Sequence, residues 1–160
     1  MNDISTSTCL WFDTQAEEAV ALYTSLIPNS RVLETTHYLE GTPLPAGTVL
    51  TIRFTLNGTE YVALNGGPVF THSPAMSMVA YCDTQDQVDR LWAKLLEGGG
   101  KESQCGWLTD KFGVSWQVLP RKLFALINTD DRAASQRAWD AIETMKKLDI
   151  AALQRAYDGG

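Results

Sequence analysis

The stretch CLWFDTQAEEA at residues 9–19 decides the fold, because its pattern returns at residues 78–88 as MVAYCDTQDQV. In both places a short apolar run ends at the tripeptide Asp-Thr-Gln, and an amphipathic segment follows. Thr14 with Glu17, and Thr84 with Gln87, have the spacing of a capping box at the start of a helix. The chain is therefore predicted to use one supersecondary unit twice, and duplicated units of this kind usually enclose a site.

The segments around the two copies predict the same order of elements. Apolar residues recur at helical spacing over residues 16–27 and 85–96. Strands are predicted over residues 31–39, 48–56 and 60–64 in the first unit. In the second unit a weak strand near 102–103 precedes a hairpin of residues 106–109 and 114–118. Each unit thus reads β-α-β-β-β, and the expected fold class is α+β, with units at about 4–67 and 75–119 of a single domain.

The composition and charge limit the kinds of partner that the chain is expected to bind. The net charge is −6, and Lys and Arg form no run, which argues against nucleic acid. An acidic balance would tolerate a neutral or cationic ligand, or serve solubility alone. No apolar run reaches membrane-spanning length, and the first residues lack the pattern of a signal peptide. Three cysteines at wide spacing suggest neither a disulfide framework nor a zinc site, so a cytoplasmic location is expected.

Residues 120–158 form a predicted helical tail. Short helices are expected near 123–127, from Asp130 or Asp131 onward, and over 150–157 with Asp149 as the cap. The tail packs either on the core or on a second subunit. It carries more apolar surface than a solvated appendage should, which predicts a homodimer with the tail at or beside the subunit contact. The residues concerned are Ala134, Ala138, Ile142, Leu148, Leu153 and Tyr157.

Several stretches resemble one protein family. They are residues 10–13 (LWFD) with 16–19 (AEEA), residues 63–68 (ALNGGP), residues 105–108 (CGWL) leading to 115–117 (SWQ), and residues 146–153 of the tail. The chain is similar to the PhnB-like family, often called 3-demethylubiquinone-9 3-methyltransferase, of the vicinal oxygen chelate superfamily. That superfamily includes glyoxalase I, the bleomycin-resistance proteins and the extradiol dioxygenases. The resemblance implies paired βαβββ units, the glyoxalase/bleomycin resistance-like fold, here with a C-terminal helical extension.

The resemblance also locates the positions at which glyoxalase-type relatives hold a metal. Two lie on the first strands of the units and two on the last strands. Counting from the repeated Asp, they fall on Ser7 and Ser77, on Gln117, and on Val62 or Ala63. Divalent ions prefer imidazole, carboxylate or thiolate ligands, and His37 and His72 lie elsewhere. No metal and no cofactor are therefore expected. A methyl-donor site of the usual kind needs a Gly-rich turn from a strand into a helix, which the residues do not show, so methyl transfer is not expected.

The candidate ligand-binding residues follow from these positions. Gln117 replaces a metal ligand and should face a cavity, unless it is a core amide bonded to backbone. Trp116 should point the opposite way, into the helix layer. No catalytic residue is identified, and Cys9 and Cys82 are expected in the core. Each of the remaining candidates could instead only pack in the core or lie on the surface without binding a ligand. They are Trp107, Trp11, Cys105, and Asn65 and His72 near the cavity mouth.

Three functions remain open from the sequence. The first is a metal-independent protein that binds an unidentified small molecule, as the drug-sequestering resistance proteins do. The second is a lyase, isomerase or dioxygenase that uses a metal, for which the ligands are missing. The third is a structural or regulatory dimer without a ligand.

Overall fold

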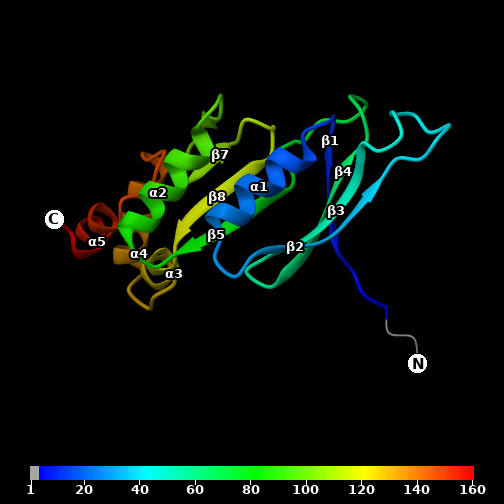
Figure 1. Ribbon diagram of the computed structural model, residues 1–160. Helices are drawn as coiled ribbons and strands as arrows, with labels where there is room; N and C mark the ends of the chain where they lie inside the picture. The colour runs from blue at the N-terminus through cyan, green and yellow to red at the C-terminus, as the bar shows by residue number, and fades with distance from the viewer. Residues whose placement is uncertain (1–3) are drawn as a thin grey trace. The chain divides into compact units, whose positions relative to one another are not determined.

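The computed structural model describes residues 4–160, and the chain divides after Thr71 into two compact units. Each unit contains one four-stranded sheet (Figure 1). The fold is α+β, as predicted, with helices added after the second sheet.

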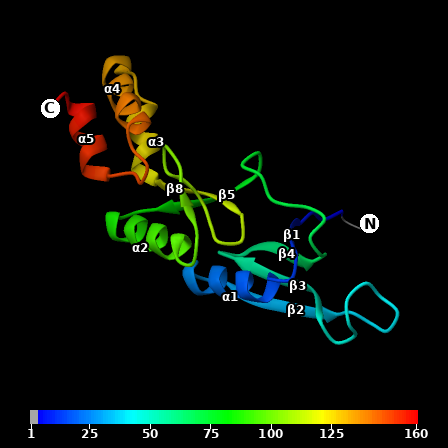
Figure 2. The ribbon, with the colours of Figure 1, turned by 90° about the horizontal axis from the view of Figure 1, so that it is seen from above.

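The first unit runs β-α-β-β-β. Its sheet has the order β1-β4-β3-β2, in which β1 pairs with β4 in parallel and the other pairs are antiparallel. Helix α1 packs on one face of this sheet, against β3 and β4 (Figure 2). The bounds are β1 (Thr8–Phe12), α1 (Ala16–Leu26), β2 (Arg31–His37), β3 (Val49–Leu56) and β4 (Thr59–Asn65).

The second unit repeats this plan. Its sheet has the order β5-β8-β7-β6, again with a parallel pair, β5 with β8, formed by the first and last strands. The second helix has the predicted bounds, whereas the first ends one residue earlier than predicted. The bounds are β5 (Ser77–Cys82), α2 (Gln85–Leu96), β6 (Lys101–Glu102), β7 (Trp107–Thr109) and β8 (Ser115–Pro120).

The strand register shows how closely the units correspond. Phe12 and Cys82 directly precede the two Asp-Thr-Gln copies, and they lie opposite Asn65 and Pro120 in the parallel pairs. Counting back three residues in each unit brings Val62, opposite Cys9, into correspondence with Gln117, opposite Val79. Of the two positions proposed in the first unit, the register therefore selects Val62.

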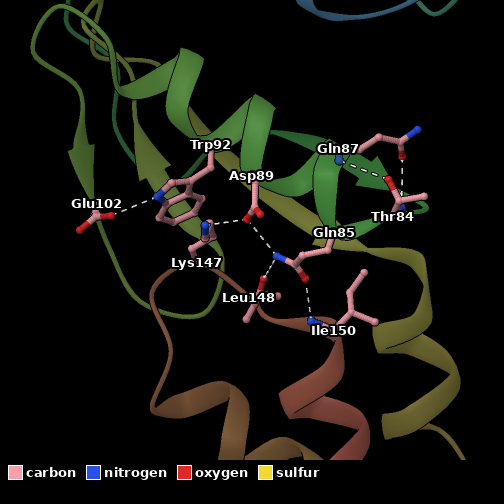
Figure 3. A network of polar contacts seen from close by, with 9 residues as sticks. All are labelled: Thr84, Gln85, Gln87, Asp89, Trp92, Glu102, Lys147, Leu148 and Ile150. Atoms are coloured by element: carbon pink, nitrogen blue, oxygen red, sulfur yellow. Dashed lines mark hydrogen bonds and ion pairs between the residues drawn. The ribbon is translucent and has the colours of Figure 1, made fainter.

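The two helix starts differ although their sequences match. The Thr84–Gln87 capping box is formed as predicted: Gln87 N donates to Thr84 Oγ1 at 3.3 Å, and Thr84 N donates to Gln87 Oε1 at 3.4 Å (Figure 3). The predicted Thr14–Glu17 box is wrong, because the N-cap of α1 is Gln15 and not Thr14, and the Gln15 side chain makes no cap bond.

Asn65 explains this difference. Its side-chain oxygen accepts from Ala16 N at 2.9 Å, so β4 supplies the cap that Thr14 was expected to give. The corresponding residue of the second unit is Pro120, which carries no polar side chain. The second helix must therefore be capped from its own sequence.

This contrast predicts unequal effects of matched substitutions. Thr84→Ala should lower the free energy of unfolding by about 1 kcal/mol, because it removes a helix cap. Thr14→Ala should cost less than about 0.5 kcal/mol, as expected for an exposed residue outside any cap. Urea denaturation followed by circular dichroism measures both. Equal losses for the two variants would contradict the assignment of the caps.

The tail forms three helices that pack on one another: α3 (Arg121–Ile127), α4 (Arg132–Glu143) and α5 (Ile150–Asp158). The apolar residues on which the homodimer argument rested are buried or half-buried within the chain, most of them in a core with Leu119 of β8, whereas Phe124 and Trp139 are exposed. The argument that these residues need a partner subunit is therefore wrong, since the chain covers them itself, while the homodimer stays a prediction. Within residues 4–160 no helix has both the length and the apolar character needed to cross a bilayer. The members of this core are Leu119, Leu123, Leu126, Ala138, Ile142, Leu148 and Leu153.

Candidate functional site

The second sheet has one covered face and one open face. Helix α2 packs on the first, and Trp116, on that face, is only 2 % exposed, as predicted. Neighbouring residues of a strand point to opposite sides, so Gln117 belongs to the other face. At one end this open face is covered by the tail core, which buries Leu119, two residues further along β8.

Gln117 lies at the centre of a short row on the open face. Its strand partners are Val79 on β5 and Trp107 on β7, and directly opposed residues share a face. The Gln117 Nε2 atom donates to Ser77 Oγ at 2.9 Å. Its Oε1 atom receives no hydrogen bond from the described residues. The structure thus brings together two predicted ligand-binding residues, Gln117 and Trp107, and pairs Gln117 with the predicted first-strand position Ser77.

Asp110 fixes the hairpin that carries these residues. The carboxylate is 3 % exposed and accepts hydrogen bonds from Phe112 N at 2.9 Å and Val114 N at 3.0 Å. Its second oxygen accepts from the indole of Trp116 at 3.0 Å. This carboxylate orders the turn and locks Trp116 inward, which determines that Gln117 points outward.

Replacing Asp110 tests that role. Asp110→Asn leaves one oxygen for the backbone amides but sets an amide NH₂ against the Trp116 indole N–H. We expect the free energy of unfolding to fall by about 2 kcal/mol, the typical cost of an unsatisfied buried donor. Asp158→Asn, at the exposed end of α5, is the control and should change little. Chemical denaturation measures both, and a loss below about 0.5 kcal/mol for Asp110→Asn would contradict the assignment.

Trp11 lies on the open face of the first sheet and is fixed by the segment that follows β4. Its indole Nε1 donates to Gly67 O at 2.8 Å, and the Phe70 ring meets it edge-on at 5.0 Å. A Cβ atom at Gly66 would overlap the indole ring, so only glycine fits there. The Gly66–Gly67 pair therefore exists in part to seat Trp11.

Three other candidates have different surroundings. Asn65 was expected at a cavity mouth, but its side chain is buried under α1, where it caps the helix and donates to Val49 O at 3.1 Å. The expected position of Asn65 at a cavity mouth is therefore wrong. Side chains alternate along β4, which puts Asn65 on the covered face of the sheet and Leu64 on the open face. His72 begins the second unit and is half-buried. Cys105 lies two residues before Trp107 and packs against the tail core.

The sequence analysis missed a charged cluster on the open face of the first sheet. Arg53 lies opposite Val62 and bonds Glu60 Oε1 at 3.0 Å and Glu34 Oε2 at 2.8 Å. The hydrogen bonds with Glu60 and Glu34 raise the pKa of the guanidinium above its usual value. The cluster could have been predicted in part from the alternation along β3, because Arg53 stands between the apolar Ile52 and Phe54 and must face the opposite side of the sheet.

Cys9 and Cys82 lie on the first strands of the two units; Cys82 is buried as expected, whereas Cys9, which was expected in the core, is exposed because it faces away from α1. Partial burial raises the pKa of the Cys9 thiol, and burial together with Asp83 raises that of Cys82, so both favour the unreactive thiol form. Across residues 4–160 no three His, Cys, Asp or Glu side chains gather where they would share a metal ion. The expectation of no metal remains a prediction.

Comparisons with known proteins agree with this architecture. The family model described as 3-demethylubiquinone-9 3-methyltransferase matches residues 4–119. The Bacillus cereus PhnB protein, whose name carries the same activity in provisional form, is 36% identical, with a TM-score of 0.67 over 73% of this chain and 99% of its own.

More distant structures share the fold alone. Protein PA1353 from Pseudomonas aeruginosa is 20% identical, with a TM-score of 0.59 over 74% of this chain and 98% of its own. The fosfomycin resistance protein FosX from Listeria monocytogenes, in complex with Mn(II) and sulfate, is 12% identical, with a TM-score of 0.51 over 74% of this chain and 92% of its own. No curated protein matches the chain. On the family model and the Bacillus cereus relative, the chain belongs to the PhnB-like 3-demethylubiquinone-9 3-methyltransferase family.

Proposed function

We propose that this chain binds a small molecule on the open face of its second sheet, at Gln117 and Trp107, without a metal ion. One observation carries the proposal. The Gln117 amide is oriented by Ser77 through one atom, and its other polar atom has no partner among the described residues, next to a half-buried indole.

The chemistry of this pair suits a small, flat, polar molecule. An indole offers a broad apolar surface, and an amide beside it fixes orientation through one hydrogen bond. Because a serine hydroxyl both donates and accepts, the Gln117 amide can turn over without losing Ser77. The remaining polar atom of the amide then serves as an acceptor or as a donor, so it suits a ligand that carries either kind of group.

The donor set argues against a metal as the binding device. Ser7, Ser77, Val62 and Gln117 occupy the positions given by the repeat, and Val62 has no donor atom at all. The Ser77 hydroxyl and the Gln117 amide already bond each other. Manganese, zinc and iron favour carboxylate, imidazole or thiolate ligands, which none of these four residues supplies.

Methyl transfer, which the family description names, is not part of the proposal. The strand-to-helix turns of the two units are Asp13-Thr14-Gln15 and Asp83-Thr84, and neither contains a glycine that would admit a donor's phosphate or carboxylate to the backbone. The family description therefore supplies the relatives and not the reaction.

Ligand-observed NMR with a fragment library tests the proposal. Gln117→Ala should weaken hits that bind the wild type by about fivefold, the effect of one net hydrogen bond. Val62→Ala, at the corresponding register position of the first unit, is the matched control and should leave the affinities within twofold. All proteins are measured with a chelator and again with added Mn(II).

Two outcomes would contradict the proposal. Hits that keep their affinity in Gln117→Ala would place the binding site elsewhere. Hits that appear only with Mn(II) and vanish with the chelator would instead establish a metal-dependent site.

A further inference from the structure

The third residue of the Asp-Thr-Gln repeat has different tasks in the two copies. Gln15 is exposed, and its side chain reaches no further than the amide of Thr14, at 3.3 Å. Gln85 is half-buried and contacts a segment more than sixty residues away in sequence. This segment, residues 144–150, runs from the end of α4 to the first residue of α5 and is called the connector below.

Gln85 holds the connector by both ends of its amide. Nε2 donates to Leu148 O at 3.1 Å, and Oε1 accepts from Ile150 N at 2.8 Å (Figure 3). Asp89, one turn further along α2, accepts from the same Nε2 at 3.0 Å and pairs with Lys147 Nζ at 2.6 Å. The first turns of α2 thus hold the connector by two hydrogen bonds from Gln85 to backbone atoms and by the Asp89–Lys147 ion pair beside them.

The connector in turn holds the residues that lead into β7. Cys105 N donates to Met145 O, and Gly106 N donates to Lys146 O, both at 2.7 Å. Both residues have left-handed backbone, with φ of 59° at Cys105 and 82° at Gly106. A non-glycine residue keeps such a conformation only where its surroundings impose it, and the connector supplies the two acceptors that do so.

Gly106 links the connector to the candidate site through hydrogen bonds on both sides. Its carbonyl accepts from Val118 N at 2.8 Å, so the residue is fixed on one side by the connector and on the other by β8. A Cβ at Gly106 would lie 3.1 Å from both Leu119 Cδ2 and Leu148 Cδ1, which shows how closely the connector packs there. The next residue, Trp107, begins β7 directly opposite Gln117.

We propose that Gln85 is a positioning residue: by holding the connector, it fixes Cys105 and Gly106 and thereby sets Trp107 beside Gln117. The family model matches residues 4–119, so Gln85, Cys105, Gly106 and Trp107 lie inside the matched part and the connector lies outside it. The relevance of Trp107 to a ligand rests on the proposed function, whereas the positioning itself does not.

The test replaces Gln85 by methionine, which keeps the length of the side chain and removes its hydrogen bonds. Iodoacetamide alkylation of the full chain, followed by peptide mass spectrometry, reports the exposure of each cysteine. Cys105 should react about fivefold to thirtyfold faster, as expected when one or two net hydrogen bonds stop opposing local opening. Cys9, exposed in the other unit, is the internal control and should keep its rate.

A second readout observes Trp107 itself. In protein labelled with 5-fluorotryptophan, the ¹⁹F resonance assigned by Trp107→Phe should shift or broaden in Gln85→Met, and that of Trp11 should not. Gln15→Met, at the same place in the other repeat copy, should change neither readout.

The opposing results are distinct. An unchanged Cys105 rate and an unchanged Trp107 resonance in folded Gln85→Met would overturn the proposal. Equal acceleration at Cys82, which is buried in β5, would show that Gln85 supports the whole unit and would also overturn it. Neither readout needs a ligand, so failure of the Gln117 experiment leaves this test intact, and the reverse holds as well.

Discussion

The parallel pairing of first and last strands governs everything else in each unit. Two strands can run in parallel only if the chain between them crosses back, and here the crossing includes a helix that packs on one face of the sheet. One face is thereby covered and the other left open. Strand alternation then assigns every side chain to one of the two, which is why adjacent Trp116 and Gln117 have opposite surroundings.

The same pairing makes the ends of the last strands important. Asn65 and Pro120 occupy corresponding positions beside the start of the helix. An amide there caps α1 from outside and relieves Thr14 of that task, whereas a proline leaves Thr84 to cap α2 alone. One residue of a distant strand thus decides whether a local helix signal is used.

The sequence predicted what depends on neighbours along the chain. The order of elements, the bounds of α2, the Thr84–Gln87 cap, the Asp149 cap and the inward Trp116 all follow from local pattern and are found in the structure. The start of α4 was predicted at Asp130 or Asp131, and the structure has Asp131 as the cap. The errors concern contacts between distant segments. The cap on α1 comes from Asn65, 49 residues away, and the apolar side of the tail is covered by its own helices and Leu119. For the same reason Ser77 and Gln117 were predicted as separate positions, and the hydrogen bond between them was not predicted. The ion pairs of Arg53 with Glu34 and Glu60 were not predicted either.

The two amides at Cys105 and Gly106 have a consequence for any homologue without a tail. In this chain their hydrogen-bond acceptors are carbonyl groups of Met145 and Lys146, beyond the end of the family match. A shorter homologue that keeps a Cys-Gly-Trp turn must pair those N–H groups with water or with another segment, because unpaired buried amides are rarely tolerated. Where water is the partner, the conformation of that turn depends on hydration. In the present chain the carbonyl groups of the tail take the place of those water molecules.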